Sequence, residues 1–505
     1  MTARAVRPVM VGVVLVALTL RLLHLHAVSP LLLDAAPEVG MDRWLAMHVA
    51  EAVARGDWLG GWSADYDSAP GYGYLLGALF RLSGGHWLGP VLLQIALGAL
   101  TCWLAYDLGR RLWSPTAGML AAWLLALYAP ALFYETLLVK YSLLSVTVGA
   151  LLVCVARAGE TGRLRYAGLA GVALGTLVAL RGNAALVVLP CGWWLLRDHP
   201  VREGARRLVV FLAGAALVLG PLVLRDHVAA SRGRGTSLWG IHFYIATSSR
   251  ADGTYIPVAG VRDDVVGHVV DARRLAEERE GRRLSPQEVS WHWFQRGLTA
   301  IRSGPLRYAS LELRKLRLSL AGGEDGSFGD DFDDSAEASW VLRLPLVSFG
   351  SVVPLALLGF GLAFRRRQAA LLAWFVVVYV ASLLPFFITG RYRLPIVVPM
   401  LVLAGGALDW LAERLRGPRG FAPLVAVLFM AIMLSVLAAD ARDRWTFVGV
   451  LALGVTAATL LAAPAGGSLD EVAERAQAVE TLVGHPWPVT RRPGELPQPG
   501  TSVSK

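Results

Sequence analysis

Charged residues are scarce in this sequence. They make up 17% of its 505 residues, whereas hydrophobic residues make up 55%. The apolar residues also come in long blocks instead of the alternating patterns of soluble domains, so an ordinary soluble fold is excluded for most of the chain. The composition therefore predicts an all-α polytopic membrane protein.

Cysteines are also few, and the chain has no internal repeat or heptad run. Cys102, Cys154 and Cys191 all fall within apolar stretches, which indicates neither a disulfide framework nor a zinc site. The net charge of +10 does not indicate a nucleic-acid partner, because the arginines cluster in short loops on one predicted side of the membrane. By the positive-inside rule that side is the cytoplasm, and both termini are expected there.

About twelve stretches are long and apolar enough to cross a bilayer core about 30 Å thick. The first is expected to be an uncleaved helix, because Arg21 and two histidines follow its apolar core and no small-residue cleavage site does. We predict spans near residues 9–28, 88–109, 115–133, 137–156, 166–180, 184–196, 207–224, 342–363, 369–388, 394–412, 421–438 and 446–463.

These spans divide the chain into four regions. Residues 1–224 form an N-terminal transmembrane bundle, which includes a first outer loop at 29–87, and residues 225–341 form a larger extracytoplasmic loop region. Residues 342–463 form the C-terminal transmembrane helices, and the Pro- and Gly-rich tail at 464–505 is expected to be cytoplasmic and partly disordered. Chemistry, if present, is expected in the outer loops.

The outer loops carry helical patterns of their own. "MDRWLAMHVAEAVARGDW" (41–58) has the apolar spacing of an amphipathic helix that lies along the membrane surface. "GYGYLLGALFRLSG" (71–84) predicts a second helix, too short to span the bilayer. In the large loop, "LSPQEV" (284–289) is a start signal for a helix near 285–303.

Arginines stand where the predicted spans meet the outer surface. Arg391 and Arg393 lie in "FFITGRYRLPIVVP" (386–399), and Arg181 lies in "ALRGNAALVVLP" with Asn183 beside it. The positive-inside rule disfavours cations on this side, whereas the planar fork of a guanidinium matches phosphate oxygens. We therefore interpret the three arginines as phosphate ligands, with snorkelling towards lipid headgroups as the alternative.

Among the carboxylates of the first outer loop, Asp42 stands out. It begins the first loop helix, where the helix dipole favours an ionised carboxylate that can take a proton from an acceptor hydroxyl or amine. The alternative is a simple helix cap.

A short outer hairpin, "YAPALFYETLLVKYSLL", holds Glu135 and Lys140. Lys140 is a candidate point charge for the phosphate and Glu135 a candidate supporting or metal-binding group, unless the two form an ion pair. In "GIHFYIATSSRADGTY", Tyr244 is a weak candidate for substrate contact, as is Tyr392 between the arginines, and His242 is interpreted as a structural hydrogen bonder.

Taken in order, these pieces resemble the C-type integral-membrane glycosyltransferases, and among them the bacterial relatives of protein O-mannosyltransferases and of the aminoarabinose transferase of lipid A. The stretches that carry the resemblance cover about 400 residues. They are "MDRWLAMHVAEAVARGDW", "SAPGYGYLLGALFRLSG", "LLQIALGAL", "LLALYAPALFYETLLVKYSLL", "ALRGNAALVVLP", "FYIATSSRADGTY" and "RYRLPIVVP".

The resemblance implies transfer of a sugar from a polyprenyl-phosphate donor to a lipid, glycan or protein acceptor outside the cytoplasmic (inner) membrane. The family's catalytic acidic residue matches Asp42, although many members have an Asp-Glu pair where this chain has Asp42-Arg43, and "APGYGY" departs from the more common Pro-Leu-Tyr pattern. In this interpretation Asp42 deprotonates the acceptor, while Arg181, Arg391 and Arg393, helped by Lys140, hold the departing phosphate. The need for a divalent metal is left open.

Two other classes of function also use outer-face arginines. A lipid-linked sugar flippase would need them for its phosphate, but such transporters usually bind near the midplane between related repeats, and neither feature is found. A non-catalytic protein of envelope assembly would instead use the large outer loop to bind a partner.

Overall fold

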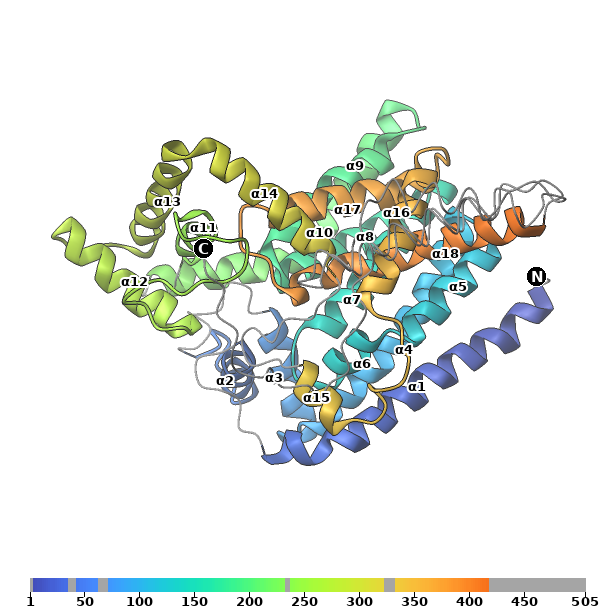
Figure 1. The fold of residues 1–505 in the computed structure, drawn as a ribbon, viewed down its shortest axis with the longest axis horizontal. Coiled ribbons are helices and arrows are strands. Elements are labelled where there is room, and N and C mark those ends of the chain that lie inside the picture. The colour runs from blue at the N-terminus through green and yellow to red at the C-terminus, as the bar shows by residue number, and fades with distance from the viewer. Residues whose placement is uncertain (1–2, 35–41, 62–70, 232–236, 322–331, 417–505) are drawn as a thin grey trace, which may run out of the picture. The chain divides into compact units, whose positions relative to one another are not determined.

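The computed structural model describes residues 3–34, 42–61, 71–231, 237–321 and 332–416 (Figure 1). Met1–Gly417 form one compact unit, to which all of these residues belong. The described residues are helical and contain no β-strand, only one isolated bridge between Tyr128 and Val347. The predicted all-α class is confirmed for this part of the chain.

Ten apolar helical segments make up the predicted transmembrane part of the described residues. Five are long and apolar enough to cross a membrane: Val6–Ser29 within α1 (Ala3–Asp34), α4 (Leu88–Leu112), α7 (Tyr141–Thr161), α10 (Val201–Ser231), and Gly390–Glu413, which joins η4 (Gly390–Arg393) to α18 (Leu394–Arg416). Shorter apolar segments are α5 (Pro115–Ala126), α8 (Leu164–Leu180), η2 (Gly182–Val187) with α9 (Val188–Leu196), α16 (Phe349–Ala363) and α17 (Ala370–Leu383).

Each predicted span up to residue 412 overlaps one of these segments, and the chain is a multi-pass membrane protein. The spans predicted near 421–438 and 446–463, and the tail, lie outside the described residues, so the total number of spans stays a prediction. The boundary expected at residue 224 differs from the structure, because α10 continues to Ser231.

The helix expected across 115–133 is interrupted. α5 ends at Ala126, and a separate helix, α6 (Ala129–Thr136), has Pro130 in its first turn. Proline is tolerated there because the backbone N–H groups of a first turn have no partner within the helix. The chain then leaves helical geometry until α7 starts at Tyr141, with Lys140 at its N-cap. This break places the Lys140 side chain at a helix end instead of inside a span.

The two predicted helices of the first outer loop are present as α2 (Asp42–Ala54) and α3 (Gly71–Ser83). They lie against each other at two glycines: a Cβ on Gly73 would come within 2.6 Å of the Val49 side chain, and one on Gly77 within 2.7 Å of Val53. Because only glycine permits this approach, the pairing fixes the direction of α2 and the position of its first residue, Asp42.

The predicted large outer loop contains α11 (Trp239–Thr247), α12 (Val265–Glu280), α13 (Pro286–Ser303), α14 (Pro305–Leu320) and α15 (Phe332–Ala338). The predicted start of α13 is confirmed, since Ser285 and Glu288 form a capping box. α11 and α13 approach so closely at Gly240 that its N–H donates to Ser290 Oγ at 2.8 Å. The buried Trp293 of α13 packs with Ile241 and Ile245 of α11, so these loop helices have a core of their own.

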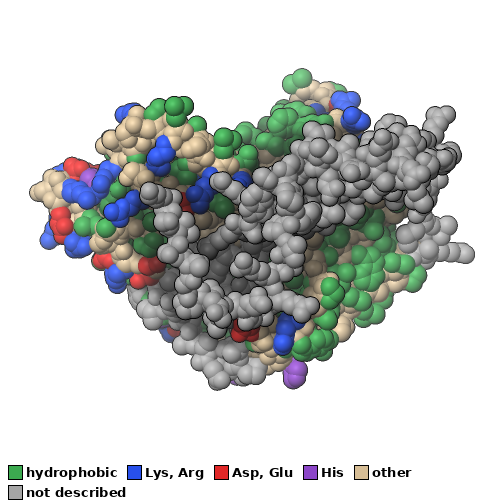
Figure 2. All heavy atoms as spheres, viewed as in Figure 1, with side chains coloured by type: hydrophobic (Ala, Val, Ile, Leu, Met, Phe, Trp, Pro, Cys, Tyr) green, Lys and Arg blue, Asp and Glu red, His purple; other side chains and the backbone are tan. Residues whose placement is uncertain are grey.

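Side-chain types are unevenly distributed over the described residues. Charged side chains gather over α12 and α13, whereas hydrophobic side chains cover the surface around α1, α4 and α5 (Figure 2). This is the division expected when one part of a protein faces lipid and another faces water.

Candidate active site

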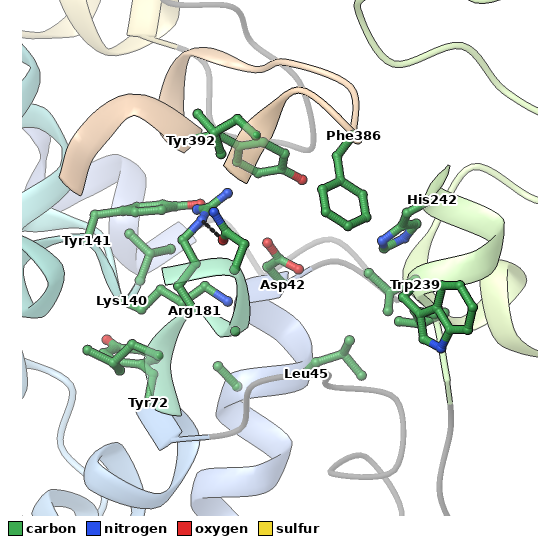
Figure 3. Close-up of a pocket in the computed structure, with 18 of the residues that line it drawn as sticks. Asp42, Leu45, Tyr72, Lys140, Tyr141, Arg181, Trp239, His242, Phe386 and Tyr392 are labelled. Atoms are coloured by element: carbon green, nitrogen blue, oxygen red, sulfur yellow. Dashed lines mark hydrogen bonds between the residues drawn. The ribbon is translucent and has the colours of Figure 1, made fainter. Parts of the chain in front are cut away.

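A cavity of about 400 Å³ lies where the ends of several helices meet (Figure 3). Its walls come from both predicted outer loops and from the ends of predicted membrane helices. The polar and charged residues that line it include Asp42, Lys140, Arg181, Asn183, His242 and Tyr392. The apolar walls include Leu45, Trp239 and Phe386.

Asp42 occupies the first position of α2, where the helix dipole favours its charged form. Its carboxylate lies 3.5 Å from Arg391 Nη2, and its side chain, 41% exposed, lines the cavity. The surrounding protein would raise the pKa of Asp42, but the positive charges of Arg391, Lys140 and Arg181 outweigh that effect and hold the pKa below its ordinary value. The carboxylate is therefore an ionised proton acceptor at neutral pH.

Arg181 and Lys140 bring positive charge to the same cavity. Arg181 ends α8, where its Nε donates to Asn183 Oδ1 at 3.3 Å and its guanidinium carbon stands 4.0 Å from the centre of the Tyr392 ring. Asn183 in turn donates to Ser382 Oγ at 2.7 Å. The Lys140 side chain makes no hydrogen bond or ion pair within the described residues, so its ammonium group is available to an anion.

The arginines of the 386–399 stretch have different surroundings. Arg391 is buried, with 5% of its side chain exposed, and reaches Asp42 from behind the cavity wall. Arg393 is also buried, but its Nη1 donates to the carbonyl of Ala321 and its guanidinium stacks over Phe349 at 4.3 Å. Arg393 does not line the cavity, so the expectation that it holds the phosphate is not supported by its position.

Glu135 lies elsewhere too. Its carboxylate accepts a hydrogen bond from Arg21 Nε of α1 at 2.5 Å, and both side chains are buried. The pairing is needed because an unpaired carboxylate at this buried position would be very unfavourable. Glu135 therefore neither pairs with Lys140 nor lines the cavity, and its expected support of the site is not seen. Among the described residues, no group of three His, Cys, Asp or Glu side chains is arranged to hold a metal ion.

Tyr244 was expected to contact substrate and His242 to be structural, but on α11 it is His242 that faces the cavity. Tyr244 packs against Trp293 of α13, with ring centres 5.0 Å apart, and lies away from the cavity. His242, interpreted from the sequence as structural, lines the cavity with Asp42. The sequence holds no signal for this choice beyond the histidine itself.

Comparison with known families gives one match. Residues 67–224 match the family described as dolichyl-phosphate-mannose-protein mannosyltransferase. This segment contains α3 to α9 and most of α10, and supplies Lys140, Arg181 and Asn183, whereas Asp42 precedes it. No curated protein matches the chain.

Among solved structures, the chain is similar to the Archaeoglobus fulgidus oligosaccharyltransferase. The structure with zinc and sulfate has 14% identity and a TM-score of 0.44, over 96% of this chain and 59% of that chain. The structure of the archaeal oligosaccharyltransferase AglB from the same organism, with an inhibitory peptide and a dolichol-phosphate, has 14% identity and a TM-score of 0.44, over 97% of this chain and 61% of that chain. The chain thus spans about three fifths of the length of these structures.

The family match covers the part of the chain that forms the cationic side of the cavity. Three stretches that carry the resemblance lie wholly within the match: "SAPGYGYLLGALFRLSG", "LLALYAPALFYETLLVKYSLL" and "ALRGNAALVVLP". The resemblance to the C-type integral-membrane glycosyltransferases is thereby confirmed, through a mannosyltransferase family matched over residues 67–224.

Proposed function

We propose that this chain is a glycosyltransferase that moves a sugar from a polyprenyl-phosphate donor to an acceptor on the extracytoplasmic side of the membrane. The observation that carries the proposal is the arrangement of one ionised carboxylate, Asp42, with the cations Lys140 and Arg181 around a single cavity. The matched family, described by its transfer of mannose from a dolichyl phosphate, supports this class of donor and suggests mannose as the first sugar to test.

The proposed reaction is a displacement at the anomeric carbon of the donor sugar. Asp42 takes the proton of the acceptor hydroxyl while the acceptor oxygen forms a bond to that carbon. The bond from the carbon to the phosphate oxygen breaks, and the phosphate leaves with the bonding electrons. Lys140 and Arg181 stabilise the charge that grows on the phosphate, an effect for which one well-placed donor contributes roughly 3–4 kcal/mol.

Arg391 has a different role in this proposal from the one expected from the sequence. Its guanidinium pairs with Asp42 instead of lining the cavity, so it holds the carboxylate in place and keeps it ionised. Asn183 and Tyr392 orient Arg181. Two cations then remain to bind the donor phosphate.

The test is Asp42→Asn in purified full-length protein, with a labelled polyprenyl-phosphate mannose and protein, glycan and lipid acceptors. Transfer should fall by at least about 10²-fold, because the acceptor proton then has no base. Glu51→Gln is the matched control, since Glu51 lies exposed on the same helix and should leave transfer unchanged. Full transfer by folded Asp42→Asn would refute Asp42 as the base, and donor translocation without a new bond would favour a flippase.

A further inference from the structure

A hydrogen-bonded chain runs from the cavity into the large outer loop. His242 Nε2 of α11 lies 3.3 Å from His268 Nδ1 of α12, and His268 Nε2 lies 2.8 Å from the hydroxyl of Tyr255. His268, in the middle of this chain, is 3% exposed, so water is largely excluded from it, and Phe387 packs against both His242 and Tyr255. These residues have no part in the reaction described above.

The carboxylate of Asp263, next to Tyr255, determines which atom donates in each of these hydrogen bonds. Burial raises the pKa of Tyr255, and the hydrogen bond between its hydroxyl and Asp263 raises it further, as expected when the phenol donates to a carboxylate. The Tyr255 oxygen then accepts a hydrogen bond from the N–H at His268 Nε2.

Both imidazoles are neutral at physiological pH. Burial lowers the pKa of His242 to about 3 and also lowers that of His268. A neutral imidazole carries one N–H, so His268 that donates from Nε2 must accept at Nδ1. The donor to that nitrogen is His242 Nε2–H, which leaves a lone pair on His242 Nδ1.

The free nitrogen belongs to a residue that lines the cavity. His242 Nδ1 has no hydrogen-bond partner within the described residues, and in Figure 3 the His242 ring stands beside Asp42, below Phe386. An acceptor nitrogen of a cavity-lining residue that has no protein partner is available to a ligand that donates a hydrogen bond to it.

We propose that His242 Nδ1 accepts a hydrogen bond from a hydroxyl group of the substrate beside Asp42, and that His268, Tyr255 and Asp263 are positioning residues that fix the His242 tautomer. The inference rests on the proposed function, because it takes the cavity to hold the donor sugar and the acceptor. The hydroxyl belongs either to the donor sugar or to the acceptor, and kinetics can tell which.

The tautomer can be tested without any assay of transfer. Full-length protein labelled with ¹⁵N-histidine is reconstituted in lipid, and the His242 resonances are identified by their loss in His242→Asn. We expect a neutral ring with a protonated Nε2 and a bare Nδ1, and a mixture of tautomers in Tyr255→Phe, where His268 loses its acceptor. A protonated Nδ1 in the unsubstituted protein would overturn the inference, as would a tautomer that Tyr255→Phe leaves unchanged.

The substrate contact is tested by comparing two substitutions at one position. His242→Asn keeps an acceptor oxygen near the place of Nδ1, whereas His242→Leu removes it. We expect kcat/KM to fall about 5- to 100-fold in His242→Leu and to be largely retained in His242→Asn. His292→Leu is the control, because His292 bonds Glu280 and does not line the cavity.

The kinetic constants separate the two sources of the hydroxyl. If removal of one donor hydroxyl lowers kcat/KM for the unsubstituted protein but not for His242→Leu, the hydroxyl belongs to the donor. The same pattern with a deoxy acceptor assigns it to the acceptor. Unchanged kcat/KM for both substrates in His242→Leu overturns the inference and leaves the proposed function intact. Retained transfer in Asp42→Asn instead contradicts the proposed base and leaves the His242 contact intact.

Discussion

The charges around the cavity differ in what they contact. Arg391 pairs with Asp42, whereas Lys140 and Arg181 line the open space. A carboxylate beside one cation stays ionised, and the two remaining cations still favour an anionic ligand. The site can thus hold a proton acceptor and a phosphate at the same time, which a carboxylate without the buried arginine would make difficult.

The pairing of Arg391 with Asp42 predicts a pH effect. A carboxyl with a depressed pKa remains ionised until the pH falls through that low value, so the proposed activity of Asp42 as a base is lost only in acid. Arg391→Gln removes the nearest positive charge and raises the pKa of Asp42. We expect the acid limb of the profile of kcat/KM against pH to move to higher pH in this variant.

Arg393→Gln provides the comparison for Arg391→Gln. It removes a buried arginine from the same 3₁₀ helix, but one that contacts Ala321 and Phe349 instead of Asp42. Its acid limb should stay in place even if the variant is less stable, because the position of the limb does not depend on the amount of folded protein. Equal shifts in both variants would contradict a specific role of Arg391.

The sequence predicted where the site lies better than which side chains face it. Arg181, Lys140 and Asp42 stand at ends of apolar or amphipathic segments, which hydropathy locates well. Side-chain direction depends on local geometry: in the 3₁₀ helix at 390–393, residues two apart point roughly 120° apart, which separates Arg391 from Arg393. On α11, positions two apart lie on nearly opposite faces, which separates His242 from Tyr244.

Helices far apart in the sequence are joined by a buried ion pair. Arg21 of α1 and Glu135 of α6 are both almost fully buried, and Arg21 Nη1 also donates to the carbonyls of Ala17 and Ala126. No sequence pattern pairs residues so distant, so the sequence suggests for Glu135 only a supporting or metal-binding role, or an ion pair with the nearer Lys140. The break between α5 and α6 turns Glu135 towards α1 instead.

This ion pair predicts a coupled effect on stability. Arg21→Met or Glu135→Gln alone leaves one buried charge without its partner and should lower the free energy of unfolding by about 3–5 kcal/mol. Arg21→Met with Glu135→Gln removes both charges and should cost much less than the sum of the two single losses. The measurement is a double-mutant cycle from denaturant unfolding in detergent. The exposed pair of Arg55 and Glu51 serves as the control, and additive losses at Arg21 and Glu135 would contradict the coupling.

The charge distribution predicts which side of the membrane the cavity faces. Arginines cluster in the short connections after α4, α7 and α9, whereas the cavity lies at the opposite ends of α7 and α8. If the positive-inside rule holds here, the arginine-rich connections are cytoplasmic and the cavity with the helices α11 to α14 faces outwards. A polyprenyl-phosphate donor would then meet its acceptor outside the cytoplasm.

Cysteine labelling in intact cells tests this orientation. Thr299 is exposed on α13 of the large outer loop and Thr161 is exposed at the end of α7 that lies away from the cavity, so the two hydroxyl residues form a matched pair. Cys102 and Cys191 are buried and Cys154 is half-buried, which keeps background labelling low once Cys154 is replaced by alanine. We expect a membrane-impermeant maleimide to label Thr299→Cys in intact cells and Thr161→Cys only after permeabilisation. The opposite result would place the cavity on the cytoplasmic side, where the donor and acceptor proposed here would have to be replaced by cytoplasmic ones.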